Sequence, residues 1–379
     1  MRPLRFLPFC AALVVAACGG DPAVADDASA RTDAGPIEVG DPLAWALSEP
    51  GPFSTGYQSW EHTYRPAGQS ADRTIRIHVW YPTLDATGTP AMYAGLVRDR
   101  ASFVGATPAA PAHASGELPV HVFSHGHRGF GGVAHFLHRR FASHGWVTIA
   151  PDHTGNTILD NVEPRPVALW YLRSLDVTAA LDAVAAGGAG VPSLGPLDTE
   201  RVLLTGHSFG AHTVWASAGA AFDADVIAAG RCTTETPCTE AELDVFRAGV
   251  GDPRIVAAIP MAGLISSEWF GAGGHASVAI PLLAMTGSTD PNTMSGAEAQ
   301  NERAAALDFT WFDVEGACHE FFGLGCDDEA GEQERIVAAP ALALGRRHVL
   351  GDESEGTLGV LDGTVAVSER VTVRRGDSP

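Results

Sequence analysis

The stretch "ERVLLTGHSFGAHTVWASAGAAF", residues 200–222, passes from an apolar run through a glycine-flanked serine into a segment with helical spacing. Gly206, Ser208 and Gly210 match the pattern G-x-S-x-G. A serine at a sharp strand-to-helix turn has strained backbone angles, and glycine two positions away on either side avoids steric clashes. We therefore predict a strand over 200–208, a helix over 209–222 and a nucleophilic hydroxyl on Ser208. The alternative is a purely structural turn.

The segments on either side of this turn predict alternating strands and helices. Residues 74–82 alternate apolar and polar side chains, as a half-buried antiparallel strand does. Short apolar runs typical of buried parallel strands occur at 118–126, 146–153, 200–208, 254–263, 279–290 and 308–316. Helices are expected over 131–145, 168–188, 209–222 and 332–345, the last of them kinked or interrupted at Pro340. This order predicts an α/β fold with a mostly parallel central sheet and helices on both faces.

One domain over roughly residues 41–351 accommodates these elements. Residues 352–379 form a C-terminal extension that either adds a peripheral strand or remains loose. Residues 222–253 have the appearance of an insertion, which could be a small lid or an edge decoration. Within it, "TEAE" at residues 239–242 predicts a capping box that opens a short helix.

A triad can be assigned from the order of residues along the chain. Serine is a weak nucleophile unless a positioned base accepts its proton, and in α/β-hydrolases the acid and then the histidine follow the serine. Asp290 ends the strand over 279–290, and His319 directly follows the strand over 308–316. Both lie at the carboxyl ends of strands, where such folds place their sites. We therefore predict a Ser208–Asp290–His319 triad, with Glu268 as the alternative acid.

The remaining histidines are expected to be mostly structural. His207 and His212 flank the serine turn but should point elsewhere. His125 and His127 form H-x-H, a pattern that occasionally binds zinc, yet no third ligand of suitable spacing lies near them. We expect neither a metal ion nor an organic cofactor.

The segment "LPVHVFSHGHRGFGGVAHFLHRRFASHGWVTIAPDHTGNT", residues 118–157, resembles platelet-activating-factor acetylhydrolases and bacterial cutinase-like polyester hydrolases. The blocks at 254–263 and 280–293 and the turn from Gly316 to His319 are similar too, so the resemblance covers roughly residues 55–345. It implies that the backbone N–H of His127 is one donor to the oxyanion. The turn chemistry makes the N–H of Phe209 the other donor.

Two departures qualify this resemblance. Eukaryotic acetylhydrolases carry their acid after the strand that reads "AAIPMAG" here, which has no carboxylate, so Asp290 fits the cutinase-like arrangement. Dienelactone hydrolases, which are related, use a cysteine where this chain has Ser208. The resemblance implies an α/β-hydrolase fold and a serine carboxylic-ester hydrolase that acts through an acyl-enzyme on short-chain, lipid-derived or polyester esters. The alternative is a non-catalytic, surface-displayed binding lipoprotein on the same fold.

Large side chains near the expected site are candidates for an acyl pocket. They are Phe130, Met261, Trp269 and Phe270. Each could equally be an ordinary core residue.

Charge and the N-terminal segment bear on partners and location. The chain has 24 basic residues, all of them arginine, against 45 acidic ones, a net charge of −21. Such a surface repels phosphate backbones, so we expect no nucleic-acid partner, and we expect a monomer. Residues 1–18 resemble a bacterial lipoprotein signal in which Cys18 is lipidated, and residues 19–40 are expected to form a disordered tether. We therefore expect export and a lipid anchor in the bacterial cell envelope (the outer membrane in a Gram-negative cell), with free secretion after cleavage at Ala25 as the alternative.

Four cysteines remain beyond the N-terminal segment: Cys232, Cys238, Cys318 and Cys326. An even number in an exported protein favours disulfides, and three pairings are possible. The two short-range pairings, Cys232–Cys238 and Cys318–Cys326, are the simplest. The second would close the loop that begins at His319.

Overall fold

The computed structural model describes residues 40–187, 190, 192–326 and 331–375. The predicted signal, Cys18 and nearly all of the predicted tether lie outside the described residues. Residues from Val39 onward form one unit. None of the helices in the described ranges combines the length and the apolar character needed to cross a membrane.

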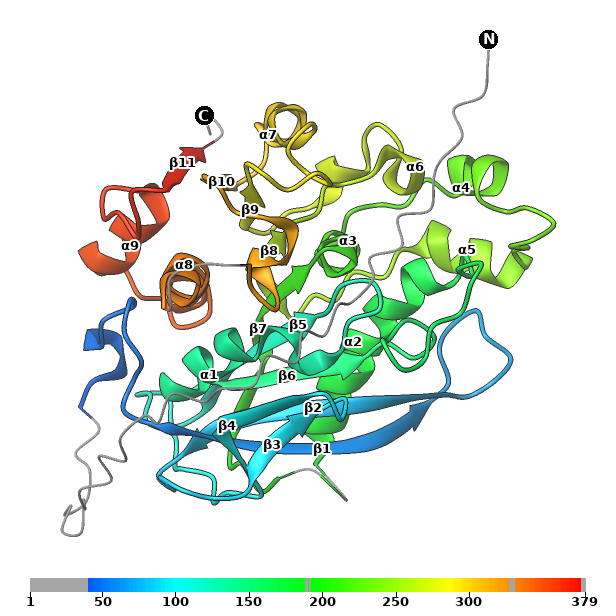
Figure 1. The fold of residues 1–379 in the computed structure, drawn as a ribbon. Coiled ribbons are helices and arrows are strands. Elements are labelled where there is room, and N and C mark those ends of the chain that lie inside the picture. The colour runs from blue at the N-terminus through cyan, green and yellow to red at the C-terminus, as the bar shows by residue number, and fades with distance from the viewer. Residues whose placement is uncertain (1–39, 188–189, 191, 327–330, 376–379) are drawn as a thin grey trace, which may run out of the picture. The chain divides into compact units, whose positions relative to one another are not determined.

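The described residues contain one mixed sheet of eleven strands, in the order β11-β10-β9-β8-β7-β5-β6-β2-β1-β4-β3 (Figure 1). Neighbouring strands from β10 to β6 are parallel, whereas β2 and β11 pair antiparallel with β6 and β10. The strands are β1 (Ser54–Tyr64), β2 (Arg73–Thr83), β3 (Pro90–Tyr93), β4 (Val97–Val104), β5 (Leu118–Ser124), β6 (Val147–Asp152), β7 (Leu197–His207), β8 (Ile255–Met261), β9 (Leu282–Gly287), β10 (Phe309–Val314) and β11 (Val371–Arg375). The predicted α/β class and its parallel centre are therefore confirmed.

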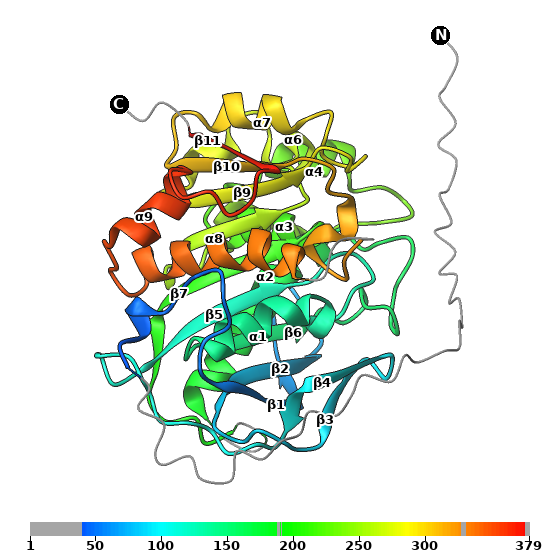
Figure 2. The ribbon, with the colours of Figure 1, turned by 60° about the vertical axis from the view of Figure 1, so that its left-hand side comes forward.

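Helices cover both faces of the sheet. The α-helices are α1 (His135–Ser143), α2 (Leu169–Ala186), α3 (Phe209–Ser217), α4 (Ala224–Gly230), α5 (Glu240–Ala248), α6 (Ser267–Phe270), α7 (Ala297–Ala304), α8 (Glu332–His348) and α9 (Glu355–Asp362). Short 3-10 turns are η1 (Pro42–Ala44), η2 (Gly131–Ala134), η3 (Gly274–Ser277) and η4 (His319–Phe322). Helices α1 and α8 lie on one face, and α2 and α3 lie on the other (Figures 1 and 2).

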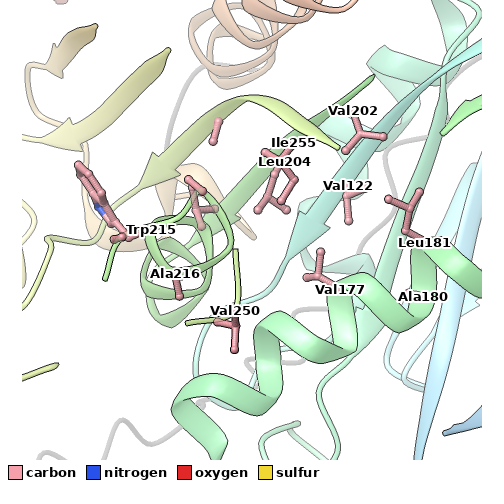
Figure 3. Packing of buried hydrophobic residues seen from close by; sticks show 14 of the residues in the cluster. Val122, Val177, Ala180, Leu181, Val202, Leu204, Trp215, Ala216, Val250 and Ile255 are labelled. Carbon is pink, nitrogen blue, oxygen red and sulfur yellow. The ribbon is translucent and has the colours of Figure 1, made fainter. Parts of the chain in front are cut away.

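Each face of the sheet has its own hydrophobic core because side chains alternate along each strand. On β7, Val202 and Leu204 pack toward α2 and α3, whereas Leu203 joins the cluster beneath α1 and α8. Figure 3 shows Val202 and Leu204 beside Val122 of β5 and Val177 of α2. These two cores hold in place the strands whose carboxyl ends carry the candidate site residues.

Two predicted features of the chain need correction or completion. Helix α8 continues through Pro340, so an interruption there is excluded, whereas a kink at Pro340 stays a prediction. A proline removes one hydrogen bond and costs about 3 kcal/mol or more, but every residue from Ile336 to Arg346 is buried. Burial of several large side chains, at roughly 1.5–3 kcal/mol each, outweighs that cost. Helix α3 ends at Ser217, five residues before the predicted end, near Gly219 with its positive φ.

The C-terminal extension and the insertion both pack on the main body. Strand β11 extends the sheet beside β10, which resolves the alternative left open for residues 352–379. In the insertion, Thr239 and Glu242 form the predicted capping box at the start of α5. Phe246 of α5 is fully buried and contacts Tyr171 of α2 with ring centroids 5.1 Å apart.

Candidate active site

Ser208 lies at the turn between β7 and α3, with φ 57° and ψ −116°. These angles are strained for a residue with a side chain, at a cost on the order of 1–3 kcal/mol, so the surrounding structure must hold them. A Cβ on Gly206 would overlap the carbonyl of Gly210, and one on Gly210 would overlap the carbonyl of Ser124. The two glycines of the motif are therefore required by close backbone contacts.

His319 lies between Ser208 and Asp290. Its Nε2 is 2.8 Å from Ser208 Oγ, and its Nδ1 is 3.1 and 3.0 Å from the two carboxylate oxygens of Asp290. The three residues follow β7, β9 and β10, whose carboxyl ends meet at one edge of the sheet. The structure thus brings together all three residues that chain order selected.

Asp290 is fully buried and is held as a carboxylate. The backbone N–H of Asn292 and the hydroxyl of Thr293 each donate to it at 2.8 Å. Burial by itself would raise the pKa of Asp290, but the hydrogen bonds from His319, Asn292 and Thr293 outweigh burial and lower it. An ionised Asp290 fixes the tautomer with the proton on Nδ1 of His319, which leaves Nε2 free to accept the Ser208 proton.

The alternative acid, Glu268, does not reach this site. It lies in α6, its side chain is 66% exposed, and its carboxylate is paired with Arg231.

The two predicted oxyanion donors lie on the helix that follows Ser208 and on the loop after β5. Phe209 is the first residue of α3, and its N–H donates to no acceptor in the described residues. The N–H of His127 is likewise free within that part of the chain. The preceding residue, Gly126, lies against the turn, because a Cβ placed on it would be 3.1 Å from the Cβ of Ser208. Two unused donors therefore lie next to the serine.

A fully buried network beneath this loop was not predicted from the sequence. Ser124 Oγ lies 2.9 Å from His153 Nε2, and His153 Nδ1 lies 2.9 Å from Asp176 Oδ2. This repeats the connectivity of a Ser–His–Asp triad, yet all three residues have no solvent exposure, so a substrate cannot reach them. Burial and the charge of Arg173 lower the pKa of His153 to about 4, so its ring is neutral at pH 7.

Arg173 of α2 connects this network to both oxyanion donors. The fully buried guanidinium donates to Asn156 Oδ1 at 2.8 Å and to the carbonyl of His125, and it lies over the Phe209 ring, 4.5 Å from its centroid. Asn156 Nδ2 in turn lies 2.6 Å from His127 Nδ1. The signal that the sequence offered was the pair of charged residues Arg173 and Asp176 within a predicted helix that is mostly apolar.

His207 and a disulfide hold His319 from two sides. His207 Nε2 lies 2.9 Å from the backbone carbonyl of His319. Burial lowers the pKa of His207 to about 4, so the ring is neutral at pH 7 and can donate to that carbonyl. Cys318 and Cys326 are bridged, which closes the loop containing His319, and Cys232 is bridged to Cys238. Both short-range pairings predicted from the sequence are present.

The four candidate pocket residues lie in the core. Phe130, Met261, Trp269 and Phe270 are at most 3% exposed. Trp269 stacks on Trp170 with centroids 3.9 Å apart, and Trp170 contacts the Phe209 ring. A role in contacting substrate stays a prediction for all four.

The histidines of the H-x-H pattern do not form part of a metal site in the described residues. No three His, Cys, Asp or Glu side chains gather into a possible ion site within the described ranges. His125 and His127 point to different partners, since His125 Nε2 accepts from the backbone N–H of His153.

A solved structure shares this architecture. It is a ferulic acid esterase from Streptomyces cinnamoneus at 2.4 Å resolution, with a TM-score of 0.56 and 18% sequence identity. The match covers 87% of this chain and 99% of that one. The chain has an α/β-hydrolase fold. No family model matches the sequence, and no curated protein matches it significantly.

Proposed function

We propose that this chain is a serine carboxylic-ester hydrolase acting through Ser208, His319 and Asp290. The observation that carries the proposal is the position of His319, 2.8 Å from Ser208 Oγ and 3.0 Å from Asp290. Similarity in fold to a ferulic acid esterase supports the same reaction class and leaves the substrate open. Short-chain, lipid-derived or polyester esters are the classes that we propose.

In the first half-reaction His319 Nε2 accepts the proton of Ser208 as Oγ attacks the ester carbonyl. The carboxylate of Asp290 stabilises the imidazolium that forms, and does not itself take the proton. The tetrahedral oxyanion accepts hydrogen bonds from the N–H groups of Phe209 and His127, which have no other acceptor within the described residues. His319 then protonates the leaving alkoxide, and an acyl-Ser208 ester remains.

In the second half-reaction His319 removes a proton from water, which attacks the acyl-enzyme. The same N–H groups bind the second oxyanion, and collapse returns the proton to Ser208 and releases the acid. Apart from the ester and the attacking water, both half-reactions use only groups of the protein. For location we propose export with a lipid on Cys18, with free secretion as the alternative.

Hydrolysis of p-nitrophenyl butyrate by the purified protein and by Ser208→Ala tests the proposal. We expect the substitution to lower kcat by about 10³-fold or more, because the nucleophile is lost. Circular dichroism should show that the variant keeps the fold. Equal rates for both proteins, or no hydrolysis by either, would contradict the proposal and favour a non-catalytic binding protein.

A further inference from the structure

Arg165 is a half-buried cation with no acceptor beside the candidate site. It lies in the loop between β6 and α2, and its Nε is buried without a hydrogen-bond partner. No carboxylate lies within ion-pair distance of it in the part of the chain that the structure describes. An arginine presents five N–H donors in a planar fork that matches a carboxylate.

Arg165 is exceptional among the partly buried arginines. Every other arginine of the described residues that is buried or half-buried donates to a carboxylate or a carbonyl. These are Arg73, Arg139, Arg140, Arg173, Arg231, Arg254, Arg346, Arg347, Arg370 and Arg374. A buried polar group normally has a partner, so an exception calls for a specific explanation.

The guanidinium of Arg165 lies over the side chain of Phe209, the residue whose N–H is one of the predicted oxyanion donors. Its Cζ is 5.0 Å from the centroid of the Phe209 ring and 5.7 Å from that of Trp170. The attraction between the cation and these rings helps to hold the guanidinium in place without using its N–H groups. Burial first, and then the charge of Arg165, lower the pKa of His127 to about 4, which places the two side chains within electrostatic range.

Burial lowers the pKa of Arg165 and the charge of nearby Glu163 opposes that effect, yet the two side chains form no ion pair in the described residues. Glu163 Oε1 accepts from Asn161 at 3.2 Å and lies 3.5 Å from His127 Nε2. Arg128 and Arg173 add further positive charge around His127. Around His127 three arginines thus face the one carboxylate of Glu163, a local excess of positive charge that favours an anionic group, although the chain as a whole carries a net charge of −21.

We propose that Arg165 binds a carboxylate on the ester substrate, so that esters carrying a free carboxylate are preferred over neutral esters of the same shape. This inference rests on the proposed hydrolase function. The carboxylate pairs with the guanidinium fork while the ester carbonyl lies at Ser208, beside the N–H groups of Phe209 and His127. The fork binds this remote carboxylate equally in the ground state and in the transition state, so the interaction acts mainly through KM.

The test compares p-nitrophenyl hemiglutarate, which carries the carboxylate in the acyl group, with neutral p-nitrophenyl valerate. A second pair, 3-carboxyphenyl acetate and phenyl acetate, places the carboxylate in the alcohol part. The two pairs distinguish the acyl side from the alcohol side. In the wild type we expect kcat/KM to be higher for the charged member of one pair.

Arg165→Gln should lower kcat/KM for that charged ester by about 10- to 100-fold, the range for losing a hydrogen bond to a charged group. The same substitution should change kcat/KM for the neutral ester by less than about threefold. Arg165→Met keeps the stacking stem and should give the same loss, which separates charge from packing. Arg100→Gln removes one exposed charge from β4 and controls for net charge, so it should leave the preference unchanged.

Two results would overturn the inference. One is that the wild type has the same kcat/KM for the charged and the neutral ester of both pairs. The other is that Arg165→Gln lowers kcat/KM equally for charged and neutral esters. Both leave the hydrolase proposal intact, because neutral esters are still turned over. If the wild type hydrolyses none of the four esters, the proposed function fails, and this inference fails with it.

Discussion

The bridge between Cys318 and Cys326 is expected to stabilise the fold and to position His319. It closes a loop of eight residues, whereas Cys232–Cys238 closes one of six. The chain-entropy model gives about 2.5 kcal/mol for the first loop and about 2.2 kcal/mol for the second at 25 °C. Removing either bridge should therefore cost nearly the same stability, and only the first lies at the candidate base.

The perturbation is the double variant Cys318→Ala/Cys326→Ala, with Cys232→Ala/Cys238→Ala as the matched control. Replacing both cysteines of a pair avoids a free thiol. Without the first bridge, the contacts that still hold His319 among the described residues are its hydrogen bonds with Ser208, Asp290 and His207. Displacing a catalytic group by about 1 Å can cost on the order of 100-fold in rate. The remaining hydrogen bonds limit the displacement of His319, so we expect a smaller fall in kcat, of roughly tenfold.

Urea unfolding monitored by tryptophan fluorescence gives the stability of each variant, and p-nitrophenyl butyrate gives kcat at 25 °C. Both double variants should lose about 2 kcal/mol at an unchanged m-value. Only Cys318→Ala/Cys326→Ala should lose kcat. The reasoning is refuted if that variant retains the wild-type kcat, or if the control loses as much activity.

Variants at three further positions test particular contacts. Asp290→Asn should keep the fold but lower kcat by about 10⁴-fold, because an amide favours the wrong His319 tautomer. The folded state lowers the pKa of Asp290, so the ionised carboxylate stabilises the fold above its ordinary pKa near 4, and this stability is lost as the pH falls through the lower folded pKa. The difference in unfolding free energy between wild type and Asp290→Asn, measured by urea titration, should therefore shrink below about pH 4. A difference that does not depend on pH would contradict this. Arg173→Lys should lower kcat about 10- to 100-fold and stability by about 3 kcal/mol, because a single ammonium group cannot reach Asn156 and His125 together. A kcat equal to that of the wild type would show that Arg173 does not position the oxyanion donors. Gly210→Ala should unfold the protein or lower its stability by more than about 3 kcal/mol in a denaturation assay. The control is Gly230→Ala at the end of α4, where a Cβ would have no neighbouring atom within 4 Å, and it should change stability by less than about 1 kcal/mol. Similar losses of stability for the two variants would contradict the packing argument.

Local sequence signals were sufficient to place the serine turn and to select three residues that the structure brings together. The G-x-S-x-G pattern, the strand before it and the helix after it depend on neighbouring residues, and they place Ser208 correctly. Asp290 and His319 could be found because each directly follows a strand, and parallel strands bring their carboxyl ends to one edge. The short disulfides needed only sequence proximity.

Long-range packing determines the features that the sequence did not reveal. The contact between Ser124 and His153 requires β5 to lie beside β6, and the contact to Asp176 requires the position and rotation of α2 on the sheet. Helix α8 continues through Pro340 because its neighbours are buried, which local propensity does not include. Trp269 and Phe270 are buried for the same kind of reason, as each stacks on an aromatic ring that is distant in sequence.

Covalent labelling tests the central claim most directly. The protein is incubated with a fluorophosphonate probe, digested and analysed by mass spectrometry, beside Ser208→Ala and His319→Ala. We predict one labelled peptide with the probe on Ser208, no labelling of Ser208→Ala and labelling of His319→Ala slowed by about 10³-fold or more, because the base that activates the hydroxyl is missing. Absence of label on the folded wild type, or label on any residue other than Ser208, would contradict the account.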